Sequence, residues 1–130
     1  MRFEYKNFAF ISEASLLAAE AALCAADQGQ FWPYHDTIFA NQSLLFDEKT
    51  NARRALKQVA ETLDLDAAAF DQCFNDREHR QDVERETEDG RAAGVDSTPT
   101  VFVNGIDLGL PESFELVQQV IEQELAKANP

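Results

Sequence analysis

The spacing of apolar and polar residues predicts a strand, a run of helices, a hairpin and a last helix. Residues 1–10 hold four aromatic residues and few helix formers, which favours a strand. From about residue 51, apolar side chains recur every three or four positions, as on one face of a helix. A helix capped by Ser12 or Ser15 is predicted to run to about residue 28. Further helices are predicted over 31–41, from about 51, after a cap at Asp66, and over 78–93.

A hairpin is predicted over residues 101–108. The β-branched and aromatic run Val101-Phe102-Val103 is followed by Asn104-Gly105, the strongest two-residue signal for a type I′ turn. Pro99 cannot donate to a sheet ladder, so we expect it at the first residue of its strand or on a sheet edge. Residues 111–125 then predict a helix with one apolar face.

The order of strand, helices, hairpin and helix predicts an α/β fold that is mostly helical by residue count. The length of 130 residues fits one domain, 1–130. A net charge of −13 argues against nucleic acid or an anionic membrane surface as partner. No run approaches the ~18 apolar residues of a membrane span, and no signal peptide is visible.

Three segments resemble the DsbA-like thioredoxin-fold family. Ser97-Thr98-Pro99-Thr100 with Phe102-Val103-Asn104-Gly105 resembles the cis-proline loop and hairpin of that family. Residues 3–8 resemble the strand that follows its active-site helix, and residues 21–36 resemble the start of its helical insertion. The segments occur in the order of the family and extend over the whole chain.

The resemblance implies a truncated thioredoxin-like α/β fold with a helical insertion. Residues 1–10 would be a sheet strand, 12–93 the insertion, and 95–130 the cis-proline loop, hairpin and C-terminal helix. The redox Cys-x-x-Cys pair of the family lies on a helix before that first strand, and the chain is expected to begin after it. Since the sheet would then lack its central strand, we expect direct pairing of 1–10 with its neighbours, or a homodimer joined through sheet edges.

The two cysteines, Cys24 and Cys73, are 49 positions apart, which excludes a Cys-x-x-Cys pair or a zinc knuckle by local spacing. Each can be a small buried apolar side chain on the inner face of a helix. The resemblance implies instead a structural disulfide between two insertion helices. Neither cysteine is predicted to be catalytic, because neither resembles an exposed thiol at a helix N-terminus.

The resemblance also implies a substrate-binding loop formed by Ser97, Thr98 and Pro99. In the family, the residue before the cis proline presents its backbone to a substrate peptide. The alternative is a strand-starting proline that only shapes the hairpin. His35 is expected to pack against a neighbouring helix and His79 to be solvated. No catalytic residue, metal site or cofactor is predicted.

The function implied by the resemblance is that of a DsbA-like thiol–disulfide oxidoreductase domain, which forms or exchanges disulfides in protein substrates. Because the chain holds no Cys-x-x-Cys pair, we expect it to be inactive as it stands. One alternative is a non-catalytic binding or dimerisation module of thioredoxin-like fold. Another is a glutathione-using relative of the kappa-type transferases and chromene-carboxylate isomerases. The family suggests an extracytoplasmic or periplasmic location.

Overall fold

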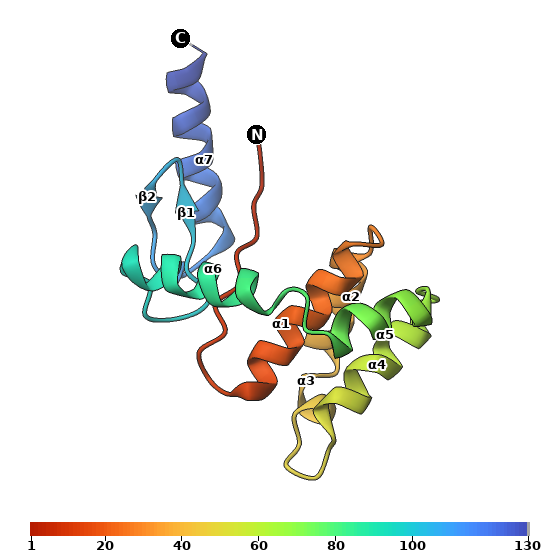
Figure 1. Ribbon diagram of the computed structural model, residues 1–130. Helices are drawn as coiled ribbons and strands as arrows, with labels where there is room; N and C mark the ends of the chain where they lie inside the picture. The colour runs from red at the N-terminus through yellow and green to blue at the C-terminus, as the bar shows by residue number, and fades with distance from the viewer. Residues whose placement is uncertain (130) are drawn as a thin grey trace. The chain divides into compact units, whose positions relative to one another are not determined.

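The computed structural model describes residues 1–129, which divide into two compact units (Figure 1). The first unit runs from Met1 to Glu88, and the second begins at Asp89. The helices of the chain up to that boundary are α1 (Glu13–Ala26), α2 (Phe31–Ala40), α3 (Gln42–Leu45), α4 (Ala52–Thr62) and α5 (Ala67–Asn75). Helix α6 (Arg80–Ala92) crosses the boundary, and β1 (Phe102–Val103), β2 (Ile106–Asp107) and α7 (Phe114–Ala128) follow it.

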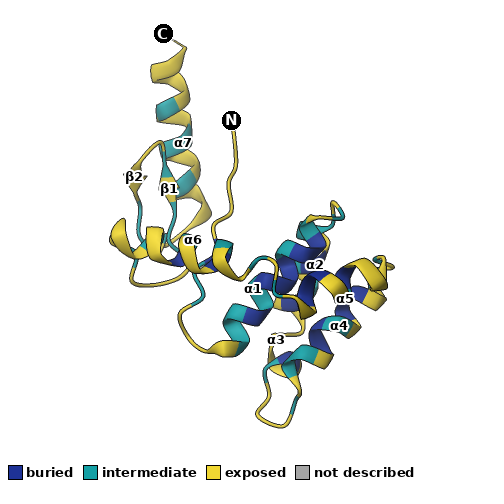
Figure 2. Ribbon diagram, viewed as in Figure 1, coloured by how far each residue is buried: buried dark blue, intermediate teal, exposed yellow. Residues whose placement is uncertain are grey.

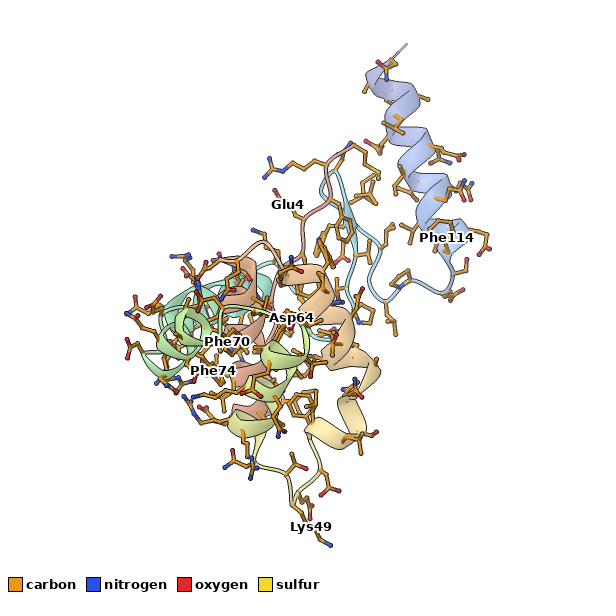
Figure 3. All side chains as sticks on the ribbon, turned by 90° about the vertical axis from the view of Figure 1, so that its right-hand side faces the viewer. Glu4, Lys49, Asp64, Phe70, Phe74 and Phe114 are labelled. Atoms are coloured by element: carbon orange, nitrogen blue, oxygen red, sulfur yellow. A yellow bond between two sulfur atoms is a disulfide. The ribbon has the colours of Figure 1, made fainter. Side chains whose placement is uncertain are left out.

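Four helices of the first unit, α1, α2, α4 and α5, pack around one hydrophobic core (Figure 2). Tyr34, Leu56, Phe70 and Phe74 are its largest apolar side chains, each at most 1% exposed. Phe70 and Phe74 project from α5 into this unit (Figure 3). Burying a side chain of this size contributes about 1.5–3 kcal/mol, so these contacts hold the unit together.

Three helices of this unit, α1, α4 and α5, begin at a residue whose side chain caps them. The side chains of Ser12, Asn51 and Asp66 each accept a hydrogen bond from a backbone N–H three residues later. Of the two serines that could cap the first helix, Ser12 is the one that does so, and the predicted cap of the brief helix at Asp66 is confirmed. The apolar stripe that predicted the helix from about residue 51 is likewise its buried face.

Residues 1–10 form no strand, so the strand predicted there is wrong. A strand requires a neighbouring backbone to pair with, and the backbone N–H groups of Asn7 and Ala9 are instead bound by side chains of α6. Glu86 Oε2 accepts from Asn7 N at 2.8 Å, and Thr87 Oγ1 accepts from Ala9 N at 3.1 Å. The described residues form one sheet of two strands, so the expected pairing of 1–10 within the chain is absent from them. The single domain over 1–130 stays a prediction.

The second unit contains the predicted hairpin. Strands β1 and β2 are antiparallel, with Val103 opposite Ile106. The turn between them places Asn104 at φ 49° and Gly105 at φ 82°, the left-handed backbone that a type I′ turn requires and that Asn and Gly tolerate. The ladder continues beyond the two strands, because Leu108 N donates to Val101 O at 2.9 Å.

Helix α7 begins one residue after Ser113, whose side chain caps it. It packs on β1 but buries none of its residues. Phe114, at its first position, is 75% exposed (Figure 3). The apolar face predicted from the sequence is therefore present on α7 but only partly covered within the described residues.

Candidate functional site

The loop Ser97–Pro99 follows the end of α6. Gly94, at φ 87°, ends the helix: its N–H donates to Arg91 O, and Val95 N donates to Gly90 O. This positive φ is why a glycine stands there. The chain then turns into an exposed loop that leads to β1.

The backbone around Thr98 is open to solvent. Ser97, Thr98 and Pro99 are exposed, and the Thr98–Pro99 peptide bond is cis. The Oγ1 hydroxyl of Thr100 donates to Ser97 O at 2.7 Å, which fixes the entrance to the loop. No hydrogen bond between described residues uses the N–H or C=O of Thr98. This N–H and this C=O can pair with an extended peptide, as in β-strand addition.

Cys24 and Cys73 form a disulfide between α1 and α5. Their Cα atoms are 5.9 Å apart, within the usual range for a disulfide. The residues are 1% and 6% exposed, and the described residues contain no free cysteine. Because both sulfurs are buried in a disulfide bond, neither is a thiolate that could act as a nucleophile. The bridge therefore acts as a cross-link of the helical unit.

The turn after α5 places His79 beside this disulfide. Arg77, at φ 53°, lies just past the end of α5, and Glu78 N donates to Cys73 O at 3.1 Å. This hydrogen bond of a Schellman motif ties the turn to the cysteine itself. His79 Nε2 then lies 2.7 Å from Asp27 Oδ2, and this carboxylate oxygen lies 3.7 Å from Cys73 Sγ.

The side chain of His79 is held from both ring nitrogens. Its Nδ1 lies 3.1 Å from Asp82 Oδ2, in the first turn of α6, and Asp82 also accepts from Arg85 at 2.7 Å. Burial lowers the pKa of His79, but the hydrogen bonds to Asp27 and Asp82 and their negative charges outweigh it, so the pKa lies above its ordinary value. The expectation that His79 is solvated is wrong, since its side chain is only 21% exposed and engages two carboxylates.

An ion pair between Glu20 on α1 and Arg77 joins α1 to the turn after α5. Glu20 is 1% exposed, and Arg77 Nε–H donates to Glu20 Oε2 at 3.2 Å. Arg77 Nη2 lies 3.1 Å from carboxylate oxygens of both Glu13 and Glu20, without the alignment of a hydrogen bond. Glu20 Oε1 has no hydrogen-bond partner among the described residues. The guanidinium is therefore the main compensation for a buried carboxylate.

His35 packs among aromatic rings of its own helix and of the N-terminal segment, and its packing against a neighbouring helix stays a prediction. Its ring centroid lies 5.1 Å from that of Tyr5, 5.2 Å from that of Trp32 and 4.7 Å from that of Phe39. The N-terminal segment, α1 and α2 surround a mostly apolar cavity of about 400 Å³ beside this cluster. Its lining supplies no pair of ionisable groups arranged for acid–base chemistry.

The structure joins Cys24 and Cys73 in a disulfide within the first unit, whereas Ser97, Thr98 and Pro99 lie in the second unit. Sequence reasoning missed Asp27 and Asp82. The spacing of His79 and Asp82, three residues apart at a helix start, was a usable local signal. Asp27 could not be found in this way, because it lies 52 positions from His79 and meets it only through helix packing.

The sequence model of a protein family described as thioredoxin matches residues 1–123. The chain belongs to the thioredoxin family. It is 31% identical to the probable disulfide bond formation protein D of Bacillus anthracis over 124 residues, which cover 93% of this chain and 56% of that protein. Together with the family match, this similarity identifies the chain as a member of the DsbA-like thioredoxin-fold family.

Two further relatives are named as transporters. The chain is 36% identical to the Na(+)/H(+) antiporter NhaA 3 of Salinispora tropica over 86% of its own length, and 36% identical to the Na(+)/H(+) antiporter NhaA of Herminiimonas arsenicoxydans over 82%. These matches cover only 16% of each antiporter. The chain thus spans about half, or less, of these curated relatives. No solved structure matches it. Among the described residues, no helix is both long and apolar enough to cross a membrane.

Proposed function

We propose that this thioredoxin-family chain is a domain of a thiol–disulfide oxidoreductase, which forms or exchanges disulfides in protein substrates. We also propose that Ser97, Thr98 and Pro99 contact the substrate. The observation that carries the proposal is the similarity to a probable disulfide bond formation protein over 93% of the chain. The exposed loop, with the unpaired backbone of Thr98, supports the substrate contact.

The exchange step itself requires a Cys-x-x-Cys pair. When the pair is oxidised, a substrate thiolate attacks one of its sulfurs and releases the other as a thiolate. A second substrate thiolate then attacks the mixed disulfide, leaving an oxidised substrate and a reduced pair. Cys24 and Cys73 are already joined to each other in the helical unit. The redox pair therefore has to come from residues other than these.

The test joins a DsbA-like Cys-x-x-Cys strand–helix segment in front of Met1 and measures oxidation of a reduced, unfolded protein. The joined protein should turn over, and the 130-residue chain alone should not. Thr98→Pro removes one backbone donor, and the loss of one such hydrogen bond should lower kcat/KM about tenfold. Thr98→Val keeps the N–H and is the matched control. Equal rates for the two variants would remove the loop from the proposal.

A second candidate function is dimerisation, favoured by the state of the second unit. No described residue after the boundary at Asp89 is buried. Its exposed large apolar side chains are Phe102, Ile106, Leu110, Phe114, Leu116 and Leu125. A two-stranded hairpin is marginally stable by itself, so a second copy that covers these side chains would stabilise it. Sedimentation of the chain against a Phe102→Glu variant tests this: a dimer that the variant dissociates supports it, and a monomer at every concentration contradicts it.

A further inference from the structure

Side chains that can bind a metal ion lie beside the Cys24–Cys73 disulfide. Cys24 Sγ, Cys73 Sγ and a ring nitrogen of His79 all lie within 4.8 Å of one another. Asp27 Oδ2 adds a carboxylate oxygen 2.7 Å from His79 Nε2 and 3.7 Å from Cys73 Sγ. Two sulfurs, one imidazole nitrogen and one carboxylate oxygen form a donor set that favours tetrahedral zinc.

We propose that reduction of the Cys24–Cys73 disulfide creates a zinc site formed by Cys24, Cys73, His79 and Asp27. A dithiol supplies two electrons and two protons, so that it becomes a disulfide and the two cysteines become thiols. The entering zinc ion displaces both thiol protons as two zinc–thiolate bonds form, and it also displaces the Nε2 proton that His79 shares with Asp27; all three protons go to solvent. The disulfide and the metal thus exclude each other, and the site exists only in the reduced chain.

The distances suit this exchange. In a tetrahedral site with zinc–sulfur bonds of about 2.3 Å, the two sulfurs lie roughly 3.8 Å apart. The Cα atoms of the cysteines are 5.9 Å apart, so rotation about the Cα–Cβ bonds can supply that separation without displacing α1 or α5. The separation of Asp27 Oδ2 and Cys73 Sγ is already 3.7 Å.

The partner of the other ring nitrogen is also in place. A histidine that binds zinc through Nε2 commonly donates its Nδ1–H to a carboxylate, which fixes the tautomer and the ring orientation. Asp82 Oδ2 lies 3.1 Å from His79 Nδ1, and Arg85 holds Asp82 from the far side. Asp82 is thus a positioning residue, and it leaves Nε2 directed at Asp27.

Solvent reaches the cluster from one side. The cysteines are buried, whereas the side chains of His79 and Asp27 are 21% and 52% exposed. An ion can therefore meet the nitrogen and oxygen ligands first and the sulfurs last. The hydrogen bond from Glu78 N to Cys73 O keeps His79 near Cys73 when the sulfurs separate, since it does not depend on the disulfide.

The experiment uses the whole chain, reduced by a phosphine so that no competing thiol is added. Zinc affinity is measured by competition with a chromophoric chelator, and cobalt(II) is bound in parallel as a spectroscopic probe. The proposal predicts one zinc per chain, a cobalt spectrum with thiolate charge transfer and intense tetrahedral bands, and at least about 100-fold weaker binding to the oxidised chain. A reduced chain that binds no zinc, or an octahedral cobalt spectrum without thiolate bands, overturns it.

Variants separate this site from adventitious binding by thiols. His79→Ala should weaken zinc binding at least about tenfold, and Asp82→Asn about tenfold, because an outer partner of a ligating histidine is worth that much. His35→Ala is the matched control, since both histidine side chains are 21% exposed, and it should bind as the unaltered chain does. Each variant is first checked for folding in its oxidised form. Equal affinities of His79→Ala and His35→Ala contradict the proposal, and the cobalt spectrum of the unaltered chain decides it independently of any variant.

Discussion

Tyr34 on α2 donates its hydroxyl hydrogen to the backbone carbonyl oxygen of Leu56 on α4, at 2.8 Å. Both residues are 0% exposed, so the bond lies inside the helical core. Burial alone raises the pKa of Tyr34 far above its ordinary value, and the phenol stays protonated as a donor. This bond fixes the register of two helices that the sequence separates by a connector.

Removing that hydroxyl tests its contribution. Tyr34→Phe should lower the free energy of unfolding by about 1–2 kcal/mol, because the carbonyl of Leu56 loses a buried partner. Tyr5→Phe is the control: Tyr5 is 39% exposed and should change the stability by less than about 0.5 kcal/mol. Urea denaturation followed by circular dichroism measures both. Equal effects would show that the buried bond contributes nothing specific.

The sequence predicted those features that depend on neighbours in the chain. Ser12 as a helix cap and Asn104-Gly105 as a hairpin turn are local signals, and the structure contains both. Residues 1–10 were predicted as a strand because strand propensity was counted without a pairing partner, and the backbone of Asn7 binds a side chain instead. The contact between Asp27 and His79 arises only from packing, and no local pattern contains it.

The disulfide should be the largest single stabiliser of the helical unit. A closed loop with a sequence separation of 49 contributes about 4 kcal/mol in the chain-entropy treatment. The double variant Cys24→Ala with Cys73→Ala should therefore be about 4 kcal/mol less stable to urea than the oxidised chain. Intact mass after alkylation, with and without reduction, shows whether the bridge is present. Two thiols that react without reduction would contradict the structure at this point.

The buried pair of Glu20 and Arg77 should be sensitive to loss of its cation. Arg77→Asn keeps a residue that tolerates the positive φ at this position but leaves the Glu20 carboxylate uncompensated, which should cost about 3–5 kcal/mol. Adding Glu20→Gln should recover part of this loss, because a neutral amide needs no counter-charge. Arg80→Gln breaks an exposed pair with Glu84 and should leave the stability nearly unchanged. Thermal unfolding of the unaltered chain, the two single variants and the double variant measures these changes in stability.

The turn of the hairpin touches α7 through Asn104, whose side-chain amide lies 3.2 Å from Glu124 Oε2. The hydrogen bond from Lys127 and, to a smaller extent, the one from Asn104 lower the pKa of Glu124 below its ordinary value. Ionised Glu124 therefore favours the folded unit above the ordinary pKa, and this contribution is lost as the pH falls through the lowered value. Asn104→Gly keeps the positive φ and removes the amide, so the pKa of Glu124 should rise. Carbon-detected NMR titration of the carboxyl group measures it; an unchanged pKa would exclude the contact.

The most direct test of the account is turnover by the chain joined to a Cys-x-x-Cys segment. We predict that the joined protein oxidises a reduced, unfolded substrate, that Thr98→Pro lowers kcat/KM about tenfold, and that Thr98→Val leaves it unchanged. A joined protein that folds and carries an oxidised Cys-x-x-Cys pair but turns over no substrate would contradict the proposed function.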